Sequence, residues 1–133
     1  MLTAVADTHT IIWYLFGDKQ LSAPVGAFFT ATAGTGDQIG ISSITPTEII
    51  YLIEKGKIPP DTFSRLKRAL VQPPTLLIEI PLDIRITGAM QAIARAQVPD
   101  MPDRIIAATA LYFGVPVLTR DAAIQGSNVQ TIW

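Results

Sequence analysis

The sequence predicts a three-layer α/β domain in which helices cover both faces of a central parallel β-sheet, as in Rossmann-like folds. The clearest indication is the stretch Val98 to Asp121, where a helical pattern ends at Gly114 and an apolar strand, Val115 to Thr119, follows at once. A helix that leads into an apolar strand after so short a turn is typical of the β-α-β crossover from which parallel sheets are built. Two earlier predicted strands, Leu2 to Ala6 and Ile39 to Ile44, are also each followed by a helical pattern.

The first quarter of the chain predicts one strand and two helices. Leu2 to Ala6 is a short apolar run that Asp7 ends, and the amphipathic pattern after it stops near Gly17. Ser22 to Ala33 predicts a second helix, because Ser is a good N-cap and Pro24 is tolerated in a first helical turn. Asp is also a good N-cap, so Asp7 by itself is more simply explained as the cap of the first helix.

The strand Ile39 to Ile44 is followed by the tetrad Thr45-Pro46-Thr47-Glu48, which has the pattern of a capping box. In that motif Thr45 is the N-cap, and the Glu48 carboxylate accepts a hydrogen bond from the Thr45 amide. The helix that begins there is expected to end at Gly56. Pro59 to Asp61 then begins another helix, whose basic side chains indicate either a solvated face or a rim that contacts phosphate.

The rest of the chain predicts two more strands besides Val115 to Thr119, and one more helix besides that of the crossover. Leu76 to Ile80 is a strand, and Asp83 caps a helix that extends through Ala94. Val129 to Trp133 is a last strand at an edge of the sheet, where Trp133 is expected to pack against the core.

Size and composition indicate one domain, residues 1–133, with a substantial core, since 49% of the residues are hydrophobic. The chain has no cysteine, which excludes disulfides and thiolate metal sites. No secretory signal is evident, and no stretch approaches the roughly 20 apolar residues that span a bilayer, so we expect a cytoplasmic protein with no membrane contact. A net charge of −1 argues against a protein that coats nucleic acid, yet it allows a nuclease with a local basic rim.

Acidic side chains follow three of the predicted strands. Asp7, Glu48 and Asp121 each lie just past a strand's carboxyl end, and Asp103 lies in the first turn of the crossover helix. In open α/β sheets, sites form at the carboxyl ends of the strands, so neighbouring strands would bring these four carboxylates together. Close carboxylates raise one another's pKa unless a cation neutralises them, and Mg²⁺ prefers oxygen ligands of this kind. The sequence shows no nucleophilic triad, Walker loop or zinc spacing that would indicate other chemistry.

Four segments together resemble the PIN-domain ribonucleases, in particular VapC-type toxins of type II toxin-antitoxin systems. They are VADTHTIIWYL, ISSITPTEIIYLIEKGKI, MPDRIIAATA and PVLTRD, and the resemblance covers nearly the whole chain. It implies that Asp7, Glu48, Asp103 and Asp121 form an acidic site for Mg²⁺ or Mn²⁺. Many relatives have His-x-Asp-Pro-x-Asp-Arg where this chain has Val98 to Arg104, so Asp100 is more simply a cap or loop acid than a metal ligand.

Several neighbours of the four acids are candidates for supporting roles. Arg104 and Arg120 each adjoin one of the acids and are expected either to contact substrate phosphate or to pair with a carboxylate. Thr8, Ser43 and Thr119 lie near strand ends, where each could hold a ligand carboxylate in place by a hydrogen bond. His9 has no second His or Cys nearby and is expected to be a surface residue.

The expected function is therefore that of a Mg²⁺-dependent endoribonuclease, in which a metal-activated water cleaves RNA phosphodiester bonds. The resemblance also implies a cognate antitoxin protein as partner and a homodimer. One alternative is a catalytically inactive PIN-like module that binds RNA or protein. Another is a receiver-type phospho-acceptor domain, which requires an Asp directly at the end of a central strand and a Lys near the last one. Here the central strand is expected to end at Ile44, and the last motif offers Arg120 instead of Lys.

Overall fold

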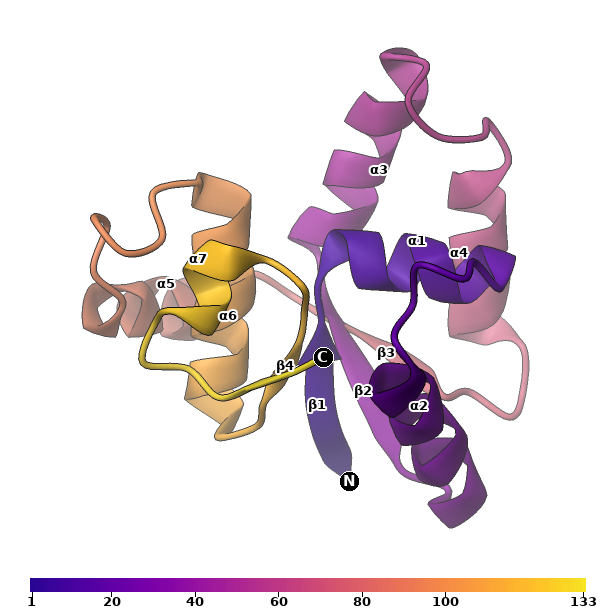
Figure 1. Ribbon diagram of the computed structural model, residues 1–133, viewed down its shortest axis with the longest axis horizontal. Coiled ribbons are helices and arrows are strands. Elements are labelled where there is room, and N and C mark those ends of the chain that lie inside the picture. Colours follow the sequence, from indigo (N-terminus) through magenta and orange to yellow (C-terminus); the bar gives the residue numbers. More distant parts are fainter.

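The computed structural model describes residues 1–133 and contains one all-parallel five-stranded sheet, with strand order β3-β2-β1-β4-β5. Figure 1 shows β1 in the middle of the molecule. The strands are β1 (Leu2–Ala6), β2 (Gln38–Ser42), β3 (Leu77–Ile80), β4 (Val117–Leu118) and β5 (Thr131–Ile132). The three-layer α/β fold with a central parallel sheet is thus confirmed.

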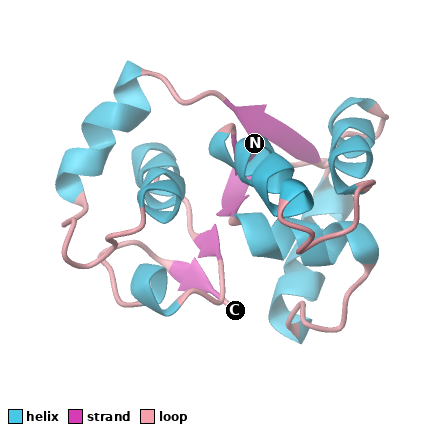
Figure 2. Cartoon of the chain, turned by 90° about the horizontal axis from the view of Figure 1, so that it is seen from above, coloured by secondary structure: helices cyan, strands magenta, loops and turns pink.

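Two groups of helices cover the two faces of the sheet, one on either side of the strands in Figure 2. One group consists of α1 (Thr8–Phe16), α2 (Ala23–Thr35), α3 (Ile44–Glu54) and α4 (Thr62–Val71). The other consists of α5 (Ile84–Ala89), the 3₁₀ turn η1 (Met90–Ala92), α6 (Met101–Phe113) and α7 (Ala122–Gln125). None of the helices is long and apolar enough to cross a membrane.

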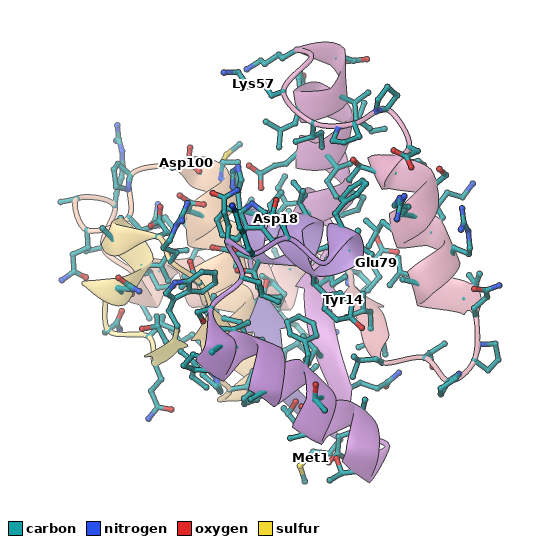
Figure 3. The ribbon with its side chains drawn as sticks, turned by 45° about the vertical axis from the view of Figure 1, so that its right-hand side comes forward. Met1, Tyr14, Asp18, Lys57, Glu79 and Asp100 are labelled. Carbon is teal, nitrogen blue, oxygen red and sulfur yellow. The ribbon has the colours of Figure 1, made fainter.

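The central strand β1 is buried on both faces over Ala4 to Ala6, as its largely apolar sequence predicts. Side chains alternate along a strand, and accordingly Ala4 and Ala6 join the core under α1 to α4, whereas Val5 joins the core under α5 to α7. Within the first of these layers, Tyr14 of α1 stacks on Phe29 of α2, with ring centroids 4.1 Å apart (Figure 3). The sheet is therefore held between two separate apolar layers.

Local signals fixed most helix ends. Gly17 and Gly114 end α1 and α6 in the left-handed conformation, with φ of 59° and 67°, which non-glycine residues rarely adopt. Ser22 and Asp83 cap α2 and α5 through their side chains, as predicted. Trp133 follows the edge strand β5 and packs against the core beside Trp13, with ring centroids 5.7 Å apart.

Two expectations about elements were wrong, and one short helix was missed. The helix expected through Ala94 ends at Ala89 and continues only as the turn η1. There the Met90 carbonyl oxygen accepts from the Ile93 amide, three residues on, and Arg104 donates to the Met90 and Ile93 carbonyl oxygens. The short helix α7 was not expected. The strand before Glu48 is not the central one either, since β1 lies between β2 and β4, so it is Asp7 that directly follows the central strand.

This strand order places three chain segments at one edge of the sheet. Because β1, β2 and β4 are neighbours and parallel, the residues that follow them lie on the same side of the molecule. α1 and α3 begin there, and so does α6, which packs against β1 and β2.

Candidate active site

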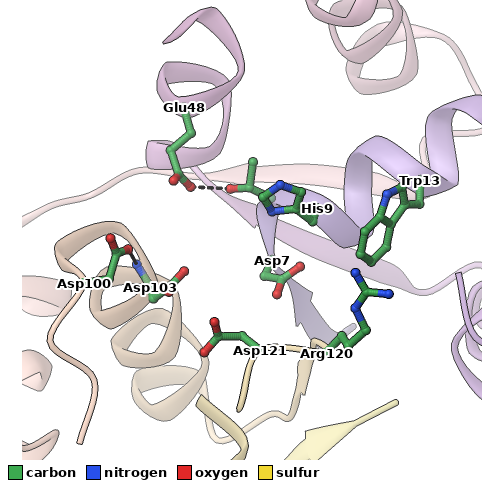
Figure 4. A pocket seen from close by; sticks show the side chains of 9 residues that line it. Asp7, His9, Trp13, Glu48, Asp100, Asp103, Arg120 and Asp121 are labelled. Atoms are coloured by element: carbon green, nitrogen blue, oxygen red, sulfur yellow. Dashed lines mark hydrogen bonds between the residues drawn. The ribbon is translucent and has the colours of Figure 1, made fainter. Parts of the chain in front are cut away.

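A cavity of about 370 Å³ opens at this edge of the sheet (Figure 4). Five carboxylates contribute to its wall, together with one arginine and no lysine. Its lining residues are Asp7, Thr8, His9, Trp13, Glu48, Asp100, Asp103, Arg120 and Asp121. All four acids that the sequence singled out therefore line a single cavity, and Asp100 lines it as well.

Asp7 is buried at the end of β1, with an exposed fraction of 7%. Its Oδ1 accepts a hydrogen bond of 2.9 Å from the Thr10 amide, which makes it the N-cap of α1. Its Oδ2 accepts a hydrogen bond from the Thr119 hydroxyl. Thr119 also accepts a hydrogen bond of 2.9 Å from the Asp121 amide, so this threonine links the segments that follow β1 and β4.

Glu48 points into the cavity from the second turn of α3, and the capping box expected around it is absent. α3 begins at Ile44, with Ser43 in the N-cap position, so Thr45 lies inside the helix. The buried Thr45 hydroxyl instead hydrogen-bonds the Thr8 hydroxyl at 3.0 Å, and Thr8 donates to Glu48 Oε1 at 2.5 Å. Burial raises the pKa of Glu48, and the nearby carboxylates of Asp100 and Asp7 raise it further, against the opposing effect of the Thr8 hydrogen bond.

Asp103 has the most unusual electrostatic environment of the five acids. It is half-buried in the first turn of α6, and no donor hydrogen-bonds its carboxylate; the cap hydrogen bond of 3.0 Å joins its backbone amide to Asp100. Burial, with repulsion from Asp121, Asp100, Glu48 and Asp7 in that order, raises the pKa of Asp103 to about 7. The ionised site thus carries an excess of negative charge that the fold itself leaves uncompensated.

Asp100 and Asp121 combine a capping role with a place in the cavity wall. Asp100 is the N-cap of α6, as the sequence indicated, and one of its carboxylate oxygens, Oδ1, makes no hydrogen bond. Asp121 caps α7 by accepting from the Ile124 amide at 2.9 Å, and its Oδ2 is free in the same way. Since a carboxylate has two oxygens, each acid can cap a helix and still present an oxygen to the cavity.

Two of the supporting roles expected from sequence are wrong. Arg104 does not line the cavity, because its guanidinium extends away and donates to the Ile93 and Met90 carbonyl oxygens, each at 3.0 Å. Ser43 holds no carboxylate; its hydroxyl accepts a hydrogen bond of 2.9 Å from the Leu82 amide and ties the start of α3 to the segment after β3. Thr8 and Thr119, by contrast, each bind one of the acids.

Trp13 and Arg120 form the side of the cavity away from Glu48 and Asp100, and His9 lies between Trp13 and Glu48 (Figure 4). His9 is exposed, as expected, with its ring centroid 5.8 Å from that of Trp13. Trp13 was not among the site residues expected from sequence. The spacing of four residues between His9 and Trp13 could have indicated it, because residues i and i+4 share a helix face. Asp7 had already placed the start of that helix at the sheet edge, so this face could be expected to border the site.

The donor set fits a hard divalent cation, although no three acidic or histidine side chains form a ready-made metal cluster here. Five carboxylates surround one space, and the only base among the lining residues besides His9 is Arg120. Mg²⁺ binds proteins through one or two carboxylates and keeps several waters, so a tight cluster is not required. Asp7, Glu48, Asp103 and Asp121 would hold such a cation, and Asp103 would gain most from it, because no donor offsets its charge.

Comparison with known proteins identifies the family. The PIN domain family matches residues 4–126, so this chain belongs to the PIN domain family, whose members are generally nucleases. A search of curated proteins gave no match.

Solved structures share the fold at low sequence identity. The chain is similar to one in a complex of VapBC2 from Rickettsia felis bound to a promoter DNA fragment, with 17% identity, a TM-score of 0.73, and coverage of 99% of this chain and 98% of that chain. A chain of a toxin-antitoxin complex from Klebsiella pneumoniae has 19% identity, a TM-score of 0.61 and coverage of 98% and 97%. A chain of FitAB bound to the IR36 DNA fragment has 20% identity, a TM-score of 0.62 and coverage of 99% and 94%.

Proposed function

We propose that the protein is an endoribonuclease of the VapC type that depends on Mg²⁺ or Mn²⁺ and is inhibited by a small antitoxin. The observation that supports this most is the convergence of Asp7, Glu48, Asp103 and Asp121 on one cavity at the carboxyl ends of parallel strands. Membership of the PIN family is consistent with nuclease chemistry, and the resemblance to VapC-type toxins points to RNA as the substrate.

In the proposed reaction, water attacks a phosphodiester phosphorus, one P–O ester bond breaks, and the departing ribose oxygen takes up a proton. A divalent cation, when bound, would orient and activate that water and offset negative charge on the phosphate. The protein's part is to hold the four acidic side chains in place. Thr119 fixes Asp7, and Thr8 fixes Glu48, so two of the proposed ligands are anchored from separate elements.

Asp103 connects metal binding to pH. Because its pKa is about 7 without a cation, a fraction of the molecules carry a proton there at neutral pH. Binding of a cation to this carboxylate would displace that proton, so the apparent affinity for Mg²⁺ should rise with pH between about 6 and 8.

An antitoxin partner and a homodimer complete the proposal. The chains similar to this one come from VapBC2 of Rickettsia felis, from FitAB and from a toxin-antitoxin complex of Klebsiella pneumoniae, which supports a protein partner for this chain. A second copy would extend the acidic cavity into a longer groove for RNA. The alternative of an inactive PIN-like module that binds RNA or protein has the same fold, and activity distinguishes it.

The test is RNA cleavage with controlled metal. The purified protein is incubated with labelled total RNA in Mg²⁺, in Mn²⁺, and in excess EDTA, and circular dichroism checks that the fold persists in EDTA. We expect cleavage with either ion, none in EDTA, and recovery when Mg²⁺ is restored. Full activity in EDTA would reject the metal mechanism, and RNA binding without cleavage under every condition would support the binding module.

A further inference from the structure

Arg120 is the only lysine or arginine side chain that lines the acidic cavity, and it forms no ion pair. The ion pairs of the chain lie elsewhere, at Met1 with Asp37, Arg65 with Asp61, and Arg85 with Asp83. No hydrogen bond occupies the Arg120 guanidinium either, even though five carboxylates share the cavity with it. Its N–H groups are therefore available to an anion from outside the protein.

An aromatic stack fixes the guanidinium in this position. Its central carbon lies 4.4 Å from the centroid of the Trp13 ring, which is 8% exposed. Trp133 packs against the same indole, with centroids 5.7 Å apart and planes at 59°, and belongs to the apolar layer under α1 to α4. A guanidinium stacked on an aromatic face keeps its N–H edges open, and that planar edge matches two phosphate oxygens at once.

The stack lies on the side of the cavity away from Glu48 and Asp100, with Asp7 and Asp121 between (Figure 4). An RNA strand with its scissile phosphate over these acids would extend beyond them, and only on the Arg120 side does the wall offer a positive charge. The stack also limits the positions that a long, exposed side chain could otherwise adopt. Less ordering is then needed when a phosphate binds, which favours binding.

We infer that Trp13 is a positioning residue that holds the Arg120 guanidinium, by stacking, where it binds an RNA phosphate adjacent to the scissile one. The inference rests on the proposed function in one respect, that the neighbouring phosphate is the one cleaved. Binding of a phosphate by Arg120 does not itself require cleavage. The simpler alternative is that Arg120 only shields the Trp13 indole from water. That alternative predicts effects on stability and none on RNA binding.

Binding is measured with a fluorescein-labelled 2′-O-methyl RNA of twelve mixed nucleotides, at several salt concentrations, with Mg²⁺ and in EDTA, and gel electrophoresis checks that the RNA stays intact. R120A should weaken binding about tenfold, the loss expected for a charge-assisted hydrogen-bonded contact. It should also reduce the slope of log Kd against log salt by about 0.7, the contribution of one phosphate contact to a single strand. R95A, which removes an exposed charge outside the cavity, is the matched control and should leave both quantities unchanged.

The role of Trp13 is tested by coupling. W13L removes the aromatic face and should weaken RNA binding and raise KM severalfold with kcat nearly unchanged, whereas W13F, which keeps a face, should restore most of the loss. In the R120A background, W13L should have no further effect on binding, because Trp13 acts through Arg120. R120K keeps the positive charge, and because this side chain is exposed, the substitution does not disturb the core. R120K should lose about as much affinity for RNA as W13L, because an ammonium group lacks the planar fork of a guanidinium.

Four outcomes would overturn the inference or part of it. R120A that binds like R95A, or a wild-type protein that does not bind the oligonucleotide, removes the phosphate site. W13L that weakens binding equally in both backgrounds, or R120K that binds like the wild type, removes the positioning role. If the wild-type protein binds this RNA through Arg120 but cleaves no RNA in any metal, the proposed nuclease function fails and the phosphate site stands.

Discussion

Asp7, Asp100 and Asp121 each cap a helix and line the acidic cavity. From sequence, capping and metal binding were competing explanations for such an acid. In the structure they are compatible. Asp7 and Asp121 follow β1 and β4 and also begin the next helix, at the sheet edge where sites form, and Asp100 caps α6, which begins at the same edge. An acid at such a position stabilises its helix before any ligand is present.

Glu48 is the acid whose two possible roles separate most cleanly by mutation. In E48Q the side-chain amide oxygen can still accept the Thr8 hydrogen bond, so the melting temperature should change little. The charge is lost, and the Mg²⁺ concentration for half-maximal RNA cleavage should rise about tenfold or more. E54Q, on the exposed end of the same helix, is the control and should match the wild type in both respects. Wild-type Mg²⁺ dependence in E48Q would confine Glu48 to a structural role.

Asp103 should make the metal-free protein less stable as pH rises. Its pKa is raised from 3.8 to about 7 in the folded state, so between these values the folded protein binds a proton that the unfolded chain has lost. Stability therefore falls as pH increases from about 4 to about 7 and stays low above that. The shift corresponds to about 4 kcal/mol at full strength, and water around this half-exposed group reduces the effect to about 1 kcal/mol.

D103N removes this penalty. In EDTA the variant should be more stable than the wild type at pH 8, by about 3 °C in melting temperature, and equal to it at pH 3.5, where both side chains are neutral. Mg²⁺ should stabilise the wild type at pH 8 and have less effect on the variant. Thermal melts at both pH values, with and without Mg²⁺, measure this, and a variant less stable than the wild type at pH 8 would contradict the assignment.

At the scale of elements, local chemistry predicted helix ends well and failed where tertiary contacts took over. Gly17, Gly114 and Asp83 act locally, and all three ended or began helices as expected. The capping box failed because Thr45 is buried against Thr8, a residue 37 positions away, which no local pattern reveals. α7 is only four residues long, too short for a periodic apolar pattern to predict it.

Gly40 shows how tightly the strands pack beside the site. A Cβ at this position in β2 would lie 2.4 Å from Cδ1 of Ile80 and 3.0 Å from Cδ1 of Leu2. G40A should therefore reduce the free energy of unfolding by about 1–3 kcal/mol. I80V removes the closest of these atoms, so the double variant G40A/I80V should be more stable than the sum of the two single changes predicts. Urea denaturation of the three variants tests this, and strictly additive losses would show that the contact is relieved elsewhere.

At the scale of the whole molecule, the convergence of the acids follows from topology. Three acids that come after parallel strands meet only if those strands are neighbours, and the order β2-β1-β4 makes them so. The parallel arrangement was predictable from the apolar strands and the crossover, but the position of β1 at the centre was not. Asp7, directly after the central strand, meets one requirement of a receiver-type domain, yet Arg120 rather than Lys lies near β4, and the chain belongs to the PIN family.

The same topology explains why Arg104 could not be placed from sequence. It follows Asp103 directly, and both lie in the first turns of α6, but adjacent helix positions are about 100° apart and point in different directions. Asp103 faces the cavity, while Arg104 faces η1 and donates hydrogen bonds to the carbonyl oxygens of Met90 and Ile93. Arg120 lies in the segment after β4, so it shares the cavity edge with Asp121.

The excess of acidic groups in one cavity also predicts how a protein inhibitor would act. An arginine or lysine from a partner, placed among Asp7, Glu48, Asp103 and Asp121, would neutralise the same charge as a cation and block access of phosphate. We expect the protein to be a dimer in solution and to form a stable complex with the small protein encoded next to its gene. That complex should have no RNase activity and should bind Mg²⁺ more weakly than the free protein.

Co-expression with the neighbouring gene product, size-exclusion chromatography and an RNase assay test this prediction. D103N/D121N removes two of the charges that would hold the partner's basic group, so it should weaken the complex at least tenfold, whereas E54Q should not. The paired variants distinguish a partner that occupies the cavity from one that binds elsewhere on the surface. A monomer that forms no complex and cleaves RNA unchecked would exclude the toxin-antitoxin role and leave the metal-dependent nuclease intact, because the four acids act on phosphate with or without an inhibitor.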